Sequence, residues 1–429
     1  MIQMTSEHRH RKPCQGASSP SRRRMHYGFI IVACCCLMMG VNVGLTFSCA
    51  GIFYRPVSES LGVAVGEFGI YMSVMYVTST LMLSVAGRML ERWSARWIFT
   101  AACALMGLTF LSMSLYTDVW EFYLAGGVLG VTLAFLLYLS FPTLVNRWFH
   151  TKVGLMIGIC SAASGIGGML FNPLAGWMIT EWGWRWAYGA FGLLILLAVT
   201  PLLALLLRDR PADMGLLPYG LAEAEYTAAK DRDNPKSEGM TYSQAARTPL
   251  FYALVLFAFV MMGTSTLNLF IPGFVTDHGF SLEQASLTAA AVMAGVTVGK
   301  LALGWINDRN CLLGVLVTAG AGMAGLAVLL AGAGSLPMIL SGAFLFGWAY
   351  AGVTVQSAML TRTVFGAKDY ARIYAVMSIG LAAGGALASG GWGLLADATS
   401  TAFTFSAGIA CLLLCMLLGV WALRSSRKH

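Results

Sequence analysis

Lys300 is a charged side chain deep inside a long apolar stretch, where its chemistry is that of an anion-binding group. The stretch covers 284–306 and begins after an apparent helix cap made by Ser281 and Gln284. Arg309 follows nine residues later, so Lys300 lies about 13 Å from that end of a helix. Inside a membrane a lysine costs roughly 2.5–3.5 kcal/mol, which is explained if its charge draws an anion into a wet cavity. The alternative is that the side chain extends to the membrane surface along its aliphatic stem.

Other apolar stretches contain isolated polar side chains that are also candidates for binding. They are Asn42, Tyr138, Asn268 and Gln356. A buried amide or hydroxyl needs a partner in lipid, and a water-filled cavity provides one. The alternative is a hydrogen bond between neighbouring helices, worth about 0.6 kcal/mol. We predict that these four residues line a substrate site with Lys300. Trp348 and Tyr350 are weaker candidates, because both residue types are common at membrane surfaces.

Two loops share a glycine followed four residues later by an acid and then an arginine. They are Gly87, Glu91, Arg92 and Arg96 in the first loop, and Gly304, Asp308 and Arg309 in the second. The glycines are 217 residues apart, and a second similar pair, 147–152 and 362–368, has nearly the same spacing. One period shared by two patterns predicts two halves of similar fold.

These two loops have a physical rationale as conformational latches. Their glycines would let helices approach closely, while the acid and the arginine would bridge to a neighbouring helix end. Such a latch would hold one conformation and break when the halves move. The alternative is a plain turn with surface charges, worth about 0–1 kcal/mol.

The composition indicates that much of the surface of this chain faces lipid. Of its 429 residues 58% are apolar and only 11% are charged, whereas soluble domains carry about 25% charged residues. A soluble enzyme is therefore excluded, because too few polar side chains exist to cover its surface. The net charge of +8 comes from short basic clusters between apolar runs, a pattern of membrane proteins rather than of nucleic-acid binding. The ten cysteines form no Cys-x-x-Cys pair and have no nearby histidine, so neither a zinc site nor a disulfide framework is expected.

Twelve apolar runs are long enough to cross a membrane, for which about 20 residues are needed. The first six predicted spans are 28–52, 67–89, 97–116, 121–145, 153–179 and 186–207. The second six are 249–274, 284–306, 311–333, 336–360, 372–395 and 402–424. We therefore predict two bundles, 28–207 and 249–424, with a disordered tail over 1–27 and a short tail over 425–429.

The segment 208–248 separates the two bundles. It is rich in charged residues, too polar to pack and too short to form a domain, so we predict a solvated cytoplasmic linker. With both termini in the cytoplasm, the outer loops contain only Arg55 and Arg185 of the 27 basic residues, while 24 face the cytoplasm. The outer loops also carry acids that we expect to be without partners. They are Asp118, Glu121, Asp277, Glu283 and Asp397.

The repeated glycine–acid–arginine loop resembles the signature of the major facilitator superfamily, whose members are twelve-helix secondary transporters. The resemblance covers about 28–424. Three shorter strings resemble the oxalate/formate antiporter and monocarboxylate transporter branch. They are Trp148, Phe149 and Lys152 with Gly154 and Gly158; Gly183, Trp184, Arg185 and Trp186; and Arg210 and Pro211 with Gly215, Pro218 and Gly220.

The resemblance also gives Lys300 an expected role. In this branch the eighth span carries an arginine that binds the substrate carboxylate, and alignment on Gly304 places Lys300 there. Lysine keeps the charge but lacks the planar fork of arginine. Two departures follow: Val296 stands where monocarboxylate carriers have an acid, and 375–395 lacks the second cation of the oxalate antiporters. One cation implies one carboxylate, and Lys300 itself is left as the hypothetical proton carrier.

The sequence therefore predicts an all-α polytopic membrane protein, with twelve transmembrane helices in two pseudo-symmetric six-helix bundles of the major facilitator fold. We expect a secondary transporter, not an enzyme, that moves a small organic anion by alternating access, a monocarboxylate before other anions. No cofactor and no metal ion are expected. The expected partners are the substrate, a co-transported proton and the lipid bilayer, without nucleic acid. The expected form is a monomer in a plasma membrane, a bacterial inner membrane.

Four other functions are weighed against this one. A multidrug exporter would need an acidic residue in the cavity for cationic drugs, and a membrane sensor would need a large soluble output domain. A membrane enzyme would need a cluster of acid–base residues within the spans. ATP-driven transport would need a phosphate-binding loop, and the glycines here instead form small-residue faces for helix packing.

Overall fold

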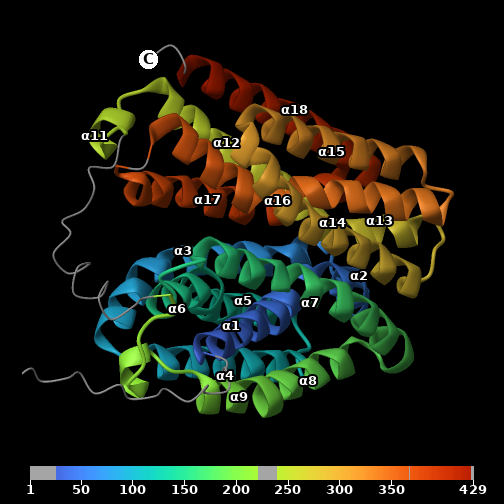
Figure 1. Ribbon diagram of the computed structural model, residues 1–429. Coiled ribbons are helices and arrows are strands. Elements are labelled where there is room, and N and C mark those ends of the chain that lie inside the picture. The colour runs from blue at the N-terminus through green and yellow to red at the C-terminus, as the bar shows by residue number, and fades with distance from the viewer. Residues whose placement is uncertain (1–25, 221–238, 367, 427–429) are drawn as a thin grey trace, which may run out of the picture.

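The computed structural model describes residues 26–220 and 239–426, except residue 367, and the chain they trace is helical throughout (Figure 1). The first half contains α1 (Gly28–Leu37), η1 (Met38–Ser48), α2 (Ala50–Leu61), α3 (Val65–Arg92), α4 (Ala95–Met113), α5 (Val119–Leu133), η2 (Ala134–Leu139), α6 (Ser140–Trp148), α7 (Val153–Trp182), α8 (Trp184–Leu194), η3 (Ile195–Val199) and α9 (Thr200–Leu206). The second half contains α12 (Pro249–Ser265), η5 (Thr266–Leu269), α13 (Ile271–Asp277), α14 (Leu282–Arg309), α15 (Cys311–Ala331), α16 (Leu336–Phe365), α17 (Tyr370–Ala398) and α18 (Thr401–Ser426). The short elements η4 (Pro211–Met214) and α11 (Tyr242–Ala245) lie between the halves in sequence.

The all-α membrane fold with two six-helix bundles is confirmed. Among the described residues, eleven helices are long and apolar enough to cross a membrane. The remaining predicted span, 67–89, corresponds to α3, a 28-residue helix that carries charged residues near its ends, among them Glu67 and Arg92. Several spans are built from two helices joined by a short irregular segment, as in α1–η1–α2 and α12–η5–α13.

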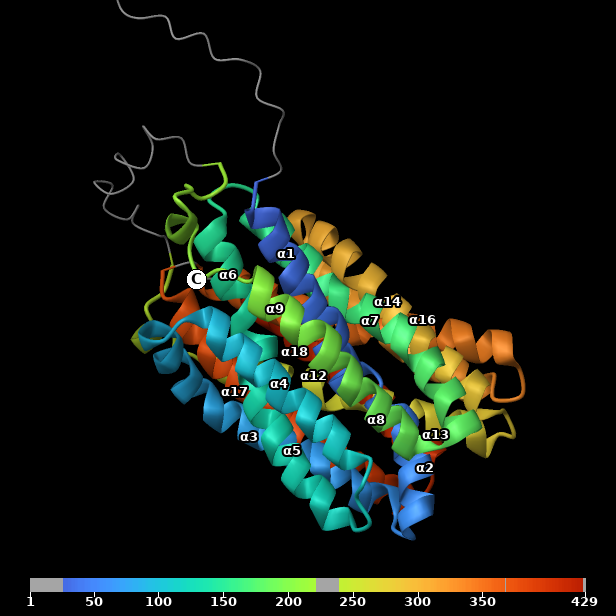
Figure 2. The same cartoon turned by 90° about the horizontal axis from the view of Figure 1, so that it is seen from below.

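The two halves form the lower and upper groups of helices in Figure 1. The most extensive packing between them joins α7 to α14 and α3 to α17. Small residues allow this approach: a Cβ on Gly165 of α7 would lie 2.1 Å from the Thr297 hydroxyl of α14. Along the length of the bundle we name the end near Gly28, Leu206 and Pro249 the linker end. The opposite end, near Leu61 and Asp277, is the distal end (Figure 2).

Both described ends of the linker pack against the half next to them. Tyr219 forms an isolated β-bridge with Phe149, and its ring lies 5.2 Å from that of Phe29. Gly239 likewise bridges to Gly366. Arg208–Gly220 and Gly239–Arg247 are therefore not free of the bundles, contrary to the expectation that the segment is too polar to pack. The reason is that its few apolar and glycine positions make the contacts; residues 221–238, 1–25 and 427–429 lie outside the described part.

Candidate functional site

Lys300 lies at the boundary between the two halves. Its Nζ donates hydrogen bonds to the Ser161 carbonyl oxygen at 3.1 Å and to Ser164 Oγ at 3.3 Å. Both acceptors belong to α7 of the first half, whereas Lys300 belongs to α14 of the second. The amine therefore points into the interface and not along its own helix towards the membrane surface.

No carboxylate neutralises Lys300 within the described part of the chain. The ion pairs found there are those of Arg55 with Glu59 and with Asp277, and both lie at the distal end. Lys300 is half-buried, and its two acceptors are uncharged oxygens. A cation held only by dipoles in a desolvated place attracts an anion strongly, because opposite charges interact more at low dielectric. The geometry can therefore bind a carboxylate that displaces the two serine contacts.

Irregular helical segments carry three of the other predicted site residues. Asn42 lies in the π-helical segment η1, Tyr138 in the π-helical segment η2 and Asn268 in the 3₁₀ segment η5. Gln356 lies in the continuous helix α16. Such interruptions are frequent at functional sites, since they redirect side chains and free backbone groups. These segments lie within three spans, so we treat the centre of the molecule as the candidate site.

Asn42 and Gln356 form hydrogen bonds inside their own halves in this conformation. Asn42 Nδ2 donates to Cys103 Sγ at 3.3 Å, and both residues belong to the first half. Gln356 Oε1 accepts from Asn307 Nδ2 at 3.0 Å in the second half. Both amides are fully buried. These contacts are those of the alternative, interhelical hydrogen bonds, and the substrate role of the two residues stays a prediction.

Tyr138 and Asn268 instead lie near the boundary of the halves. Tyr138 is close enough to Tyr76 and Tyr350 for their hydroxyl groups to interact electrostatically. Tyr350 and Asn268 line a crevice together with Tyr76, which belongs to the first half. The structure therefore brings two of the predicted residues to a central aromatic region. The sequence does not single out Tyr76 as a site residue, and it makes Tyr350 only a weaker candidate.

The predicted latch residues do not join the halves in this conformation. Neither Gly87 nor Gly304 has a heavy atom within 4 Å of an added Cβ, apart from its own helix, so neither allows a close approach here. Arg309 covers the ring of Trp305 at 3.6 Å, and Asp308 is exposed. The expected bridge from an arginine to a neighbouring helix end occurs only within the first half.

That bridge is made by Arg96. Its Nε donates to the Ala204 carbonyl oxygen at 2.8 Å, at the end of α9, and its backbone N–H donates to Asp209. Arg92 is exposed, and the Glu91 side chain lies outside the described part. We consider the hydrogen bonds and ion pairs that join the halves among the described residues, those of Arg88 aside. All of them lie at Lys300 or between Lys300 and the distal end. The latch function of these loops stays a prediction for a different conformation.

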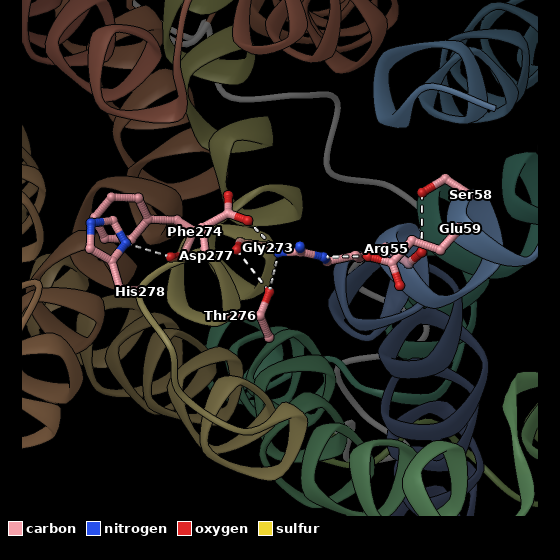
Figure 3. Close-up of polar contacts among 8 residues, drawn as sticks. All are labelled: Arg55, Ser58, Glu59, Gly273, Phe274, Thr276, Asp277 and His278. Carbon is pink, nitrogen blue, oxygen red and sulfur yellow. Dashed lines mark hydrogen bonds and ion pairs between the residues drawn. The ribbon is translucent and has the colours of Figure 1, made fainter. Parts of the chain in front are cut away.

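At the distal end, Arg55 connects the two halves (Figure 3). Its guanidinium donates to Asp277 and, at 2.9 Å, to Thr276 Oγ1, both in α13, and its Nε donates to Glu59 at 2.7 Å. The Gly66 backbone N–H also donates to Asp397 Oδ2 across the halves, at 2.9 Å. The expectation that Asp277 and Asp397 are without partners is therefore wrong. The partners come from the other half of the chain, a relation that local sequence does not show.

Close backbone contacts accompany these polar contacts. A Cβ on Gly51 would lie 2.8 Å from the Leu269 carbonyl oxygen, and one on Gly66 would lie 2.6 Å from the Leu394 backbone nitrogen. Both pairs connect the two halves. The distal end is thus closed by glycine-mediated packing and by charged groups, and the described contacts between the halves, those of Arg88 aside, are fewer at the linker end.

Another cavity of the described part does not include Lys300. It has a volume of about 750 Å³ and lies between α3, α4 and α5 of the first half, where Met82, Trp97 and Phe135 line it. All three helices belong to one half, so this cavity is not an opening between the bundles. Its walls are mostly apolar, with Arg92, Ser94 and Thr132 among the lining residues.

The chain matches a protein family and solved structures of the same fold. The family model of the Major Facilitator Superfamily matches residues 32–320 and 253–429. Two solved structures share the fold. A bacterial homolog of the human lysosomal transporter Spinster, in an inward-facing and occupied conformation, has a TM-score of 0.68 with 15% identity over 94% of this chain and 96% of that chain. A point mutant of the nucleoside transporter NupG has a TM-score of 0.69 with 11% identity over 91% of this chain and 99% of that chain.

Relatives by sequence are also transporters by name. The MFS-type transporter hasB of Aspergillus fumigatus is 30% identical over 46% of this chain and 42% of its own length. The probable transporter MCH2 of Saccharomyces cerevisiae is 27% identical over 62% and 47%. This chain thus spans less than half the length of these two relatives. The gallate transporter of Pseudomonas putida is 26% identical over 76% of this chain and 75% of its own length.

Proposed function

The chain belongs to the Major Facilitator Superfamily, and we propose that it moves a small organic anion, a monocarboxylate, by alternating access. It is a multi-pass membrane transporter and not an enzyme. The observation that carries the proposal is Lys300, a cation at the boundary of the halves without a carboxylate partner in the described part of the chain.

Binding of the anion would exchange partners at Lys300. In the structure Nζ bonds to Ser161 and Ser164 across the boundary. A substrate carboxylate offers a charged acceptor, and charge-assisted hydrogen bonds are about twice as strong as neutral ones. The carboxylate would therefore compete successfully for the amine and would loosen a contact between the halves. Substrate binding and movement of the halves would be coupled through this one side chain.

Alternating access needs contacts that break in turn at the two ends of the bundle. The distal contacts of Arg55 and Gly66 would hold the observed conformation, with access from the linker end. When the distal end opens, the loops at Gly87, Glu91, Arg92 and Arg96 and at Gly304, Asp308 and Arg309 would close the linker end as latches. The linker end would face the cytoplasm of a bacterial cell, in accord with its excess of basic residues.

One relative supports the substrate class. Gallate, which the name of the Pseudomonas putida relative gives as its substrate, is a monocarboxylate. Proton coupling is part of the proposal, with Lys300 as the carrier of the proton, because Val296 stands at the position of the acid in the resembling carriers. Tyr138 and Asn268 remain proposed substrate contacts. Asn42 and Gln356 also remain proposed contacts, and a substrate would have to exchange with their present hydrogen bonds.

Counterflow in proteoliposomes tests the proposal. Proteoliposomes that contain the purified transporter are loaded with unlabelled acids, and uptake of labelled mono- and dicarboxylates is measured. Lys300→Met keeps the length of the side chain and removes its charge, so we expect at least a tenfold loss of monocarboxylate uptake. Lys300→Arg keeps the charge and should retain part of the activity. Ser164→Ala is the matched control, since it removes one neutral contact of Nζ and leaves the cation in place. Full uptake by Lys300→Met would overturn the proposal.

A further inference from the structure

Asn268 carries an amide without a hydrogen-bond partner at the centre of the molecule. Its side chain is 3% exposed, and its Oδ1 is buried without a partner in the described part of the chain. The Oδ1 atoms of Asn172 and Asn307 are also buried without a partner, but Nδ2 donates to the Ser48 carbonyl oxygen in Asn172 and to Gln356 in Asn307. Asn268 differs from them because none of its side-chain atoms is bonded within the described part. Unpaired buried polar groups are rare in native proteins because their desolvation is not compensated. The missing partner of Asn268 is therefore informative.

The amide lies at a crevice whose walls come from both halves. Phe47, Met72 and Tyr76 line it from the first half, and Ser265, Asn268 and Tyr350 from the second. The rings of Phe47 and Tyr76 are 5.3 Å apart. Aromatic walls favour a flat aromatic guest through offset or edge-to-face contacts. The crevice thus combines one unpaired amide with a surface suited to an aromatic ring.

Lys300 is connected to this crevice through the packing of α14 against α16. The preceding residue, Gly299, packs against α16, where an added Cβ would lie 3.2 Å from Trp348 Cα and 2.9 Å from Ala351 Cβ. Tyr350 lies between these two residues of α16, and it lines the crevice with Asn268. The backbone next to Lys300 therefore packs against the turn of α16 whose Tyr350 lines the crevice with Asn268.

Resting on the proposed function, we infer that the transported anion is a hydroxylated aromatic monocarboxylate. Its carboxylate binds Lys300, its ring lies against Tyr76 and Tyr350, and its hydroxyl group pairs with the Asn268 amide. A hydroxyl both donates and accepts, which suits an amide that has one acceptor and two donors free. An acid without the hydroxyl leaves the amide unpaired and binds more weakly, by about tenfold.

The crevice must widen to admit the ring. In the structure its free volume is about 10 Å³, enough for about one water molecule. Its walls belong to the two halves that move apart during alternating access, so opening of the distal end would widen the crevice. In the observed conformation the crevice is closed around the unpaired amide.

Competition counterflow with a panel of acids tests the inference. The panel is 3-hydroxybenzoate, 4-hydroxybenzoate, benzoate, cyclohexanecarboxylate and acetate. We expect a hydroxybenzoate to compete at about tenfold lower concentration than benzoate, and benzoate to compete better than cyclohexanecarboxylate. Asn268→Leu, of similar volume, should transport benzoate and lose the preference for the hydroxyl. Thr264→Ala is the control from outside the crevice and should keep it, because the Thr264 hydroxyl donates to the Val260 carbonyl oxygen at 2.8 Å.

The outcomes separate this inference from the proposed function. Loss of uptake in Lys300→Met together with equal competition by hydroxybenzoates and benzoate overturns the inference and leaves the anion transporter standing. An unchanged preference in Asn268→Leu, or transport of aliphatic acids alone, also overturns it. Full uptake by Lys300→Met overturns both. If Asn268→Leu fails to fold, the acid panel on the unaltered protein and the smaller change Asn268→Ala give the same decision.

Discussion

Removal of Arg55 should open the distal end of the transporter. Arg55 is the side chain that contacts Thr276 and Asp277 of the other half, and its side chain is 38% exposed while that of Asp277 is 48% exposed. An exposed ion pair contributes about 0.2–1 kcal/mol, since water and salt screen it. With the added hydrogen bond to Thr276, Arg55→Ala should shift the balance between closed and open distal ends by about 1 kcal/mol, roughly fivefold.

The populations of the two states can be measured as distances between spin labels on Ser60 and Glu283, one exposed residue in each half. An unnatural amino acid should carry the labels, because the chain has ten cysteines. Arg185→Ala is the matched control: this arginine lies at the same end but bonds to the Tyr116 carbonyl oxygen within its own half. If Arg55→Ala shows the same distance distribution as the unaltered protein, the assignment of Arg55 as a distal contact between moving halves is refuted.

Two further substitutions and the pH dependence of uptake test other parts of the account. Gly66→Leu would force a side chain against the Leu394 backbone, so it should populate the open distal end more than Arg55→Ala does, and an unchanged distance distribution would contradict this. Arg96→Ala loses the hydrogen bond to the Ala204 carbonyl oxygen and should lower the free energy of unfolding by about 1 kcal/mol, to be checked by thermal unfolding in detergent. If Lys300 carries the coupled proton, the rate of uptake should vary with pH, and a rate independent of pH would rule that coupling out.

Most of the architecture could be predicted from hydropathy, because each span must be apolar over a fixed length in lipid. The seventh predicted span, 249–274, corresponds to α12, η5 and α13, which end at Asp277. The short gap between the predicted spans 311–333 and 336–360 also exists, since α15 ends at Ala331 and α16 begins at Leu336. The period of the repeat likewise identified the two halves.

Side-chain direction was harder to predict. Asn42 and Asn268 are both amides near the middle of a span, yet one bonds to Cys103 inside its half and the other lines the crevice without a partner. Helices that are apolar on all sides give no periodic signal for which face is turned to the cavity. The Arg55–Asp277 pair was missed for a related reason: the partners are 222 residues apart, and only the packed halves bring them together.

A structure with a bound monocarboxylate tests the central claim most directly. The account predicts a carboxylate oxygen within about 3 Å of Lys300 Nζ, with the bonds of Nζ to Ser161 and Ser164 broken or lengthened. A carboxylate bound elsewhere, with Nζ still bonded to both serines, would contradict it.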